Sequence, residues 1–79
     1  MRSIHDPRYK TLIQKLIELR ESKKMTQVEL ARQLMKPQSY VSKIEILERR
    51  IDVIELIDWL NTLDEEADIF IRDFIENID

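Results

Sequence analysis

Apolar residues recur every three or four positions along most of the chain, which is the spacing that places them on one face of an α-helix. Helix-start residues and two prolines divide this pattern into separate segments. The pattern predicts an all-α chain of five helices. Four of the helices cover residues 7–23, 26–34, 37–45 and 64–78. The fourth helix in chain order follows Asp52 and meets a break at Asn61 and Thr62.

The first predicted helix is expected to be the main core helix. Asp6 is a good N-cap, and Pro7 suits the first helical position, where a missing N–H costs nothing. Lys23 and Lys24 near its end place cations where the helix dipole favours them. Its apolar residues follow helical spacing: Tyr9, Leu12, Ile13, Leu16, Ile17 and Leu19.

The most informative stretch is residues 26–45, which we interpret as two short helices joined by a tight turn. The Thr26 hydroxyl can accept from the backbone N–H of Glu29, and the Glu29 carboxylate can accept from the N–H of Thr26, which makes a capping box. Pro37 cannot continue this helix but suits the first turn of the next one. Two helices in close succession are therefore expected.

The second short helix has a narrow apolar stripe and a hydrogen-bonding face. Val41 and Ile44 form the stripe and would anchor the helix to the core. The other face carries polar side chains: Gln38, Ser39, Tyr40, Ser42 and Lys43. A helix anchored in this way can lay its polar face in the major groove of DNA.

The segments TQVELARQL and PQSYVSKIE resemble the helix-turn-helix of the phage-repressor and Cro-type (Xre-like) DNA-binding family. The similarity extends roughly over residues 9–63, because the helices before and after the motif also fit that family. The resemblance implies a compact five-helix, lambda-repressor-like domain that binds double-stranded DNA.

The resemblance also implies roles for individual side chains. The residues that would read base edges are Gln38, Ser39 and Lys43, since a Gln amide pairs with adenine, Lys donates to guanine and Ser is permissive. The residues that would contact phosphates are Gln27, Tyr40, Ser42, Arg49 and Arg50. Ser42 could serve either class.

The chain departs from the family where turns are needed, because it contains no glycine. Related sequences commonly have glycine near the positions of Met35 and Leu47, and Asn or Ser in place of Ile46. Either these turns adopt the family geometry at a cost of about 1–2 kcal/mol per left-handed residue, or the third helix extends past Glu45. An extension around residues 46–50 would partly fuse the third and fourth helices.

Composition allows one domain, since 79 residues suffice for a single core. No apolar run approaches the roughly 18 residues of a membrane span, no signal-peptide pattern is expected, and the absence of cysteine is consistent with a reducing cytoplasm.

The net charge of −3 hides an uneven distribution of charge along the chain. Residues 1–50 hold twelve Lys and Arg against six Asp and Glu, and residues 51–79 hold one against ten. A basic part that contains the motif and an acidic remainder would orient the domain on a duplex.

The sequence offers no catalytic, metal or cofactor site. The single histidine, His5, has no second histidine, cysteine or suitably spaced carboxylate as a partner, so we interpret it as an ordinary solvated residue. A phosphate-cradling loop would need glycine, which is absent. We therefore expect a protein that is not an enzyme and needs no cofactor.

The apolar face of the C-terminal segment 64–78 can either fold back onto the domain or pair with a second copy, and we predict that it mediates dimerisation. This face and the tryptophan of the fourth helix exceed what one small core can bury. The residues assigned to this interface are Trp59, Phe70, Ile71, Phe74 and Ile78. A two-fold dimer would also place two recognition helices about 34 Å apart.

The chain is thus predicted to be a dimeric, cytoplasmic transcriptional regulator, most simply a repressor. One alternative of the same class is an antitoxin-like regulator whose terminal helix holds a protein partner. The other is a protein-interaction module in which altered turns impair DNA docking.

Overall fold

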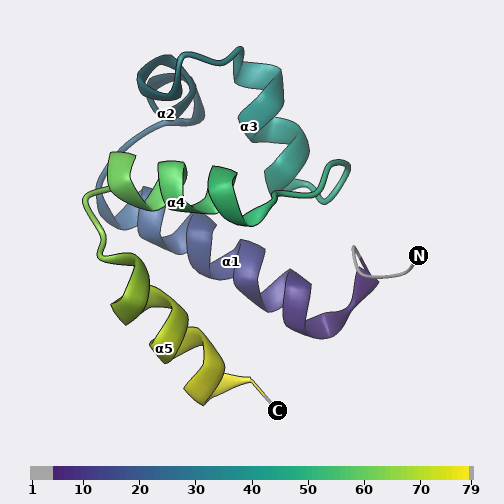
Figure 1. The fold of residues 1–79 in the computed structure, drawn as a ribbon. Coiled ribbons are helices and arrows are strands. Elements are labelled where there is room, and N and C mark those ends of the chain that lie inside the picture. Colours follow the sequence, from purple (N-terminus) through teal and green to yellow (C-terminus); the bar gives the residue numbers. More distant parts are fainter. Residues whose placement is uncertain (1–4, 79) are drawn as a thin grey trace.

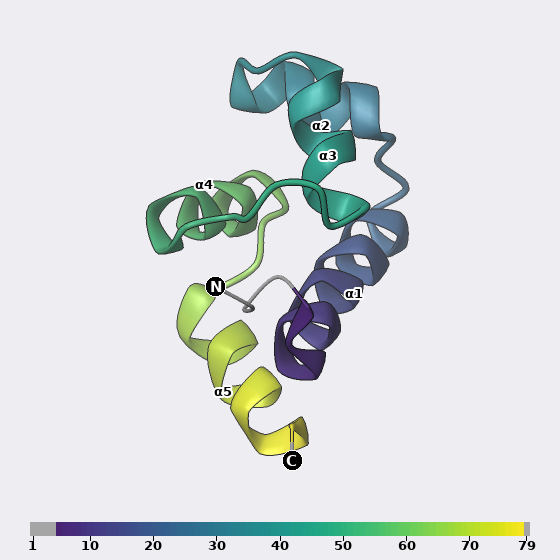
Figure 2. The same cartoon turned by 90° about the vertical axis from the view of Figure 1, so that its right-hand side faces the viewer.

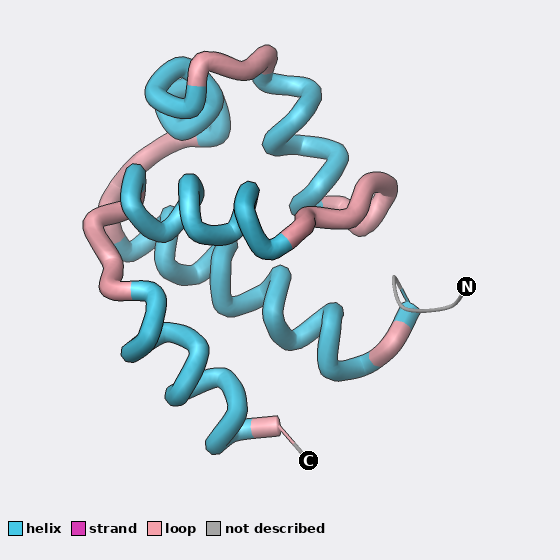
Figure 3. The backbone as a smooth tube through the Cα atoms, in the orientation of Figure 1, coloured by secondary structure: helices cyan, strands magenta, loops and turns pink. Residues whose placement is uncertain are grey.

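The computed structural model describes residues 5–78, and over this range the chain forms five α-helices and no strand (Figures 1 and 3). The helices are α1 Pro7–Ser22, α2 Gln27–Leu34, α3 Gln38–Glu45, α4 Val53–Thr62 and α5 Ala67–Asn77. The predicted all-α architecture is confirmed.

The motif helices lie at one end of the molecule and α5 at the other, with α1 and α4 between them (Figure 1). Figure 2 shows α5 beside α1, away from α2 and α3. Every helix contributes to one buried core: Ile13, Leu16, Leu30, Ala31, Val41, Ile44, Leu56, Trp59, Leu60, Leu63 and Phe70. The first helix and the motif anchors therefore belong to the same core as the C-terminal half.

The predicted helix starts are confirmed at α1 and α4. The Asp6 carboxylate accepts from the N–H of Arg8 at 2.8 Å, and Pro7 follows in the first turn. Asp52 accepts from the N–H of Glu55 at 2.7 Å, while the Glu55 carboxylate accepts from the N–H of Asp52 at 3.0 Å. This second capping box fixes where α4 begins.

Three boundaries differ from the prediction. Asn61 and Thr62 form the last turn of α4 instead of a break, because the turn lies after them. The acidic run 64–66 precedes α5 instead of forming its first turn, and Glu66 occupies the N-cap position. Pro37 likewise occupies the N-cap position of α3, one residue before the first helical residue.

All four turns between helices contain a left-handed residue that is not glycine: Lys24, Met35, Leu47 and Asp64. Each turn is a Schellman motif, in which two N–H groups bond back to the last carbonyls of the helix. After α2, for example, the N–H of Met35 donates to Arg32 at 3.0 Å and the N–H of Lys36 donates to Ala31 at 2.9 Å. These bonds satisfy the helix ends despite the left-handed backbone.

Of the two outcomes considered for residues 46–50, the structure adopts the turn, and α3 and α4 are not fused. α3 ends at Glu45, and Leu47 has φ 68°. The N–H of Glu48 donates to the carbonyl of Lys43 at 2.8 Å, which completes the turn. The Leu47 side chain packs against the core, and this burial offsets part of its backbone cost.

Two of the residues assigned to a dimer interface lie inside the protomer. Trp59 is 0% exposed and Phe70 is 5% exposed, so neither is available to a second chain. Trp59 packs edge-on against Tyr40, with ring centroids 6.2 Å apart. The other three, Ile71, Phe74 and Ile78, are half-buried.

The strained turns generate a stability prediction at Met35, whose side chain is 90% exposed and has little packing to lose. Met35→Gly should raise the free energy of unfolding by about 0.5–1 kcal/mol, because glycine removes the steric penalty of a left-handed residue. The greater conformational freedom of glycine in the unfolded chain cancels only part of this gain. Met35→Ala is the control and should give no increase. Urea unfolding of both variants measures the difference; equal stabilities would contradict the assignment of strain to this backbone position.

Candidate nucleic-acid interface

The backbone of residues 26–45 is fixed at both ends of α2. Thr26 accepts from the N–H of Glu29 at 3.0 Å, and the Glu29 carboxylate accepts from the N–H of Thr26 at 2.8 Å, so the predicted capping box is confirmed. The hydrogen bond from the Thr26 N–H to the carboxylate lowers the pKa of the Glu29 carboxyl. The left-handed turn at Met35 then leads directly into α3.

α3 is anchored by one face only. Val41 and Ile44 are fully buried, as predicted, against a core that includes Leu30 and Ala31 of α2. The opposite face is open to solvent. It carries Gln38, Ser39 and Lys43 as exposed residues and Ser42 as a half-buried one.

A buried ion pair that was not predicted from the sequence joins the end of α1 to the end of α3. Arg20 donates from Nε and Nη2 to the two carboxylate oxygens of Glu45, at 2.7 and 3.0 Å. The side chains are only 10% and 4% exposed. Nη1 of Arg20 donates to the carbonyl of Met25 at 2.8 Å, which ties in the turn before α2. The signal that could have revealed the pair is the position of Arg20, on the same helix face as Ile13 and Leu16.

Glu45 also holds the first residue of α2. Gln27 donates from its amide nitrogen to the Glu45 carboxylate at 2.7 Å, and its amide oxygen accepts from Gln38 at 3.4 Å. A carboxylate is only an acceptor, so Gln27 must turn its nitrogen to Glu45 and its oxygen to Gln38. The buried pair thereby sets the orientation of an exposed amide at the start of α3.

The remaining residues predicted to contact phosphate take different positions. Arg50 is exposed, while Arg49 pairs with Glu55 of α4 and lies with its Cζ 5.0 Å from the Tyr40 ring centroid. The Tyr40 hydroxyl accepts from Trp59 Nε1 at 3.2 Å. Gln27 is half-buried and engaged at both ends of its amide. Gln27 thus links Glu45 to Gln38, and its contact with phosphate stays a prediction.

Within residues 5–78, no group of three or more His, Cys, Asp or Glu side chains is placed to hold a metal ion. His5 is exposed. No helix in this part of the chain is both long enough and apolar enough to cross a membrane.

Comparison with known proteins bears directly on this arrangement. A family profile described as helix-turn-helix matches residues 16–70. A solved structure of an XRE-family like protein from Pseudomonas syringae pv. tomato str. DC3000 is 39% identical in sequence and superposes with a TM-score of 0.88. The similarity covers 95% of this chain and 92% of that one. The chain belongs to the XRE-type helix-turn-helix family. A search of curated proteins gave no match.

The XRE-type family match includes the whole motif, α2 and α3, together with α4 and the start of α5. This fold is that of DNA-binding regulators, and the resemblance inferred from the sequence is confirmed. The departures at Met35, Ile46 and Leu47 leave the fold intact, because the Schellman turns form without glycine.

The buried pair generates the second prediction. Glu45→Gln should lower the free energy of unfolding by about 3–5 kcal/mol, because it leaves the buried Arg20 charge without a counter-charge. Replacing both partners, as Arg20→Met with Glu45→Leu, should recover most of that loss. Asp73→Asn, which breaks the exposed ion pair between Lys15 and Asp73, is the control and should cost less than about 1 kcal/mol. Denaturant unfolding measures all three, and a double variant as unstable as Glu45→Gln would contradict the argument.

Proposed function

We propose that this protein binds double-stranded DNA in a sequence-specific manner as a homodimer and represses transcription in the cytoplasm. The observation that carries the proposal is the exposed polar face of α3, whose first side chain is oriented by hydrogen bonds that start at a buried ion pair. Preorganisation of this kind lowers the cost of ordering a side chain on binding.

Base reading is assigned to Gln38, Ser39 and Lys43. Gln38 gives one amide hydrogen to Gln27 and keeps one N–H and its carbonyl oxygen. Adenine presents N7 as an acceptor and N6 as a donor in the major groove, which matches what remains. Lys43 would donate to guanine, and the Ser39 hydroxyl can donate or accept.

Phosphate contacts are assigned to Tyr40, Ser42, Arg49 and Arg50, with Gln27 at the start of α2. These residues lie in the basic part of the chain, whereas the acidic residues concentrate after Arg50. Such contacts fix the register of a protein on DNA without reading its sequence. The charge division supports an approach to DNA with α2 and α3 leading, because the acidic part repels phosphate.

The dimer surface is assigned to segment 64–78. Phe74 and Ile78 line a hollow of about 280 Å³ together with Tyr9 and Leu12 of α1 and the ion-paired Asp6 and Arg8. Ile75 beside them is 60% exposed. A two-fold related copy would bury these groups and would set the two α3 helices about 34 Å apart, as paired half-sites require.

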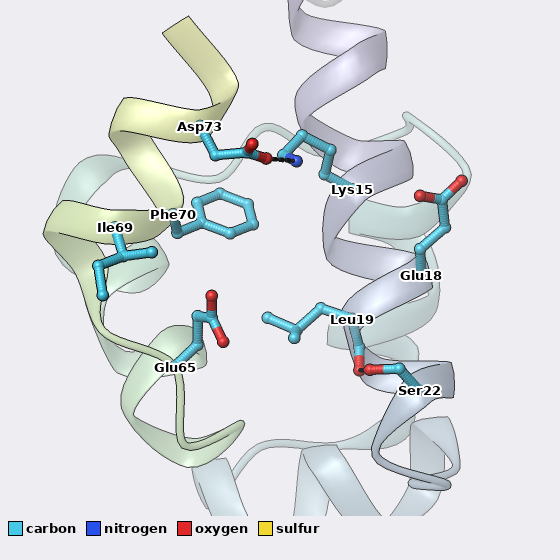
Figure 4. A pocket seen from close by; sticks show the side chains of 8 residues that line it. All are labelled: Lys15, Glu18, Leu19, Ser22, Glu65, Ile69, Phe70 and Asp73. Carbon is cyan, nitrogen blue, oxygen red and sulfur yellow. Dashed lines mark hydrogen bonds and ion pairs between the residues drawn. The ribbon is translucent and has the colours of Figure 1, made fainter. Parts of the chain in front are cut away.

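A second candidate function is an antitoxin-like regulator that also binds a protein partner. A groove of about 380 Å³ between α1 and α5 favours it. Figure 4 shows Phe70 and Leu19 pointing into this groove, with Glu65 beside them and the ion pair of Lys15 and Asp73 at one end. The accessible apolar side chains of the groove, Leu19 and Ile69, have carboxylates around them and suit a segment that is apolar and basic. Deleting α5 would abolish such binding.

The pure interaction module differs from the repressor and from the antitoxin-like regulator, because it predicts no salt-dependent binding to duplex DNA.

The division between base and phosphate contacts is testable with two variants. Gln38→Ala should cost about 1–3 kcal/mol at one base position and relax discrimination there. Arg50→Gln should weaken binding to all sequences alike and reduce the slope of log K against log salt by about 0.9. A selected-site binding assay followed by salt titration compares them. Equal, sequence-independent losses in both variants would refute the division.

The dimer is tested by light scattering on the full chain and on Phe74→Glu with Ile78→Glu. The wild-type protein should be a dimer and the double variant a monomer, because two buried carboxylates would be left without partners. Ile69→Glu adds a charge to another face of α5, where the side chain is 50% exposed, and should leave the dimer intact. A wild-type monomer at micromolar concentration, or a double variant that still dimerises, contradicts the assignment.

A further inference from the structure

The turn after α3 holds one arginine in a defined position. Nη1 of Arg49 donates to Glu55 Oε1 at 3.0 Å, and Nη2 donates to Glu55 Oε2 at 2.9 Å. Nη1 also donates to the carbonyl of Arg50 at 2.8 Å. The side chain nevertheless remains 43% exposed. It is thus fixed at the surface, close to α3.

These bonds leave one edge of the guanidinium available. Arginine has five N–H donors, of which three are used here. The Nε–H and the second Nη2–H have no acceptor within the described residues, and they form the parallel pair that binds a phosphate through two hydrogen bonds. The ion pair with Glu55 therefore does not block Arg49 as a phosphate ligand.

Tyr40 provides a rigid surface beside Arg49. Its hydroxyl accepts from the fully buried Trp59, which fixes the ring to the core. Burial raises the pKa of the Tyr40 hydroxyl, so it stays protonated at neutral pH. Its own O–H can thus be donated to an anion that lies against Arg49.

Glu55 is itself held firmly. Its carboxylate accepts from the N–H of Asp52 in the capping box at 3.0 Å, and its side chain is 19% exposed. The hydrogen bonds from Arg49 lower the pKa of the Glu55 carboxyl, so it is charged at neutral pH. A carboxylate anchored to the start of α4 thus fixes the position of the arginine.

We propose that Glu55 is a positioning residue for DNA binding, which holds Arg49 against Tyr40 so that the free guanidinium edge and the Tyr40 hydroxyl bind one backbone phosphate. This inference rests on the proposed DNA binding. On this proposal the acidic residue Glu55 contributes to affinity for a polyanion. The reason is that an arginine that is already ordered loses little conformational freedom on binding. Arg50, which is exposed and lacks such a carboxylate partner in the described residues, gains nothing in this way.

The experiment compares two substitutions that each remove one negative charge from α4. Glu55→Gln keeps the capping box, since Gln is equally suited to that position. Asp58→Asn is the matched control, because Asp58 is exposed, lies one turn further along α4 and makes no ion pair in the described part of the chain. Binding to a random-sequence duplex is followed by fluorescence anisotropy over a range of salt concentrations.

Asp58→Asn should bind slightly more tightly than wild type, because a repulsive charge is gone. Glu55→Gln should bind about 3- to 10-fold more weakly, with a salt slope reduced by about 0.9, as one lost phosphate contact predicts. In an Arg49→Gln background, Glu55→Gln should cause no further loss. Thermal unfolding of each variant confirms that the fold is retained.

Two results overturn the inference in distinguishable ways. If Glu55→Gln tightens binding as Asp58→Asn does, Glu55 only neutralises Arg49, and the positioning role is refuted while DNA binding stands. If Glu55→Gln weakens binding equally with and without Arg49, its effect does not pass through that residue. Failure of the wild-type protein to bind duplex DNA at low salt would instead refute the proposed function itself.

Discussion

The ion pair between Arg20 and Glu45 is the interaction on which the arrangement of the first three helices depends. It fixes the end of α1 against the end of α3, and the same two side chains hold the turn at Met25 and the amide of Gln27. Burying two charges is costly, and only the full set of hydrogen bonds offsets that cost. The pair therefore enforces one relative position of α1, α2 and α3.

Such enforcement is needed because α2 and α3 have eight residues each, too few to be stable helices in water by themselves. Their geometry comes from the capping box at Thr26, the left-handed turn at Met35 and the burial of Val41 and Ile44. The proposed base-reading face is simply what remains exposed once these constraints are met. Within this face, the Gln38 amide is held by its hydrogen bond to Gln27 before any ligand arrives.

The C-terminal half supports this end of the molecule in two ways. Trp59 fills the core and holds Tyr40 through its indole N–H, while Glu55 at the start of α4 holds the arginine of the preceding turn. By contrast, α5 has one fully buried residue, Phe70, with Ala67 and Ile71 packed partly against the core and one exposed ion pair to α1. Its apolar groups beyond Phe70 form the surface that we assign to a partner chain.

The sequence by itself determined the five helices, the caps at Asp6, Thr26 and Asp52, and the inward positions of Val41 and Ile44, because local hydrogen bonding and helical spacing encode them. Only the tertiary structure decided whether Ile46 and Leu47 would extend α3, since that choice balances backbone strain against burial of Leu47 in the core. It also decided that Trp59 and Phe70 pack within one chain, and that Arg20 meets Glu45 across 25 positions in sequence. Spacing shows which face a residue occupies, but its partner on that face depends on how the helices pack.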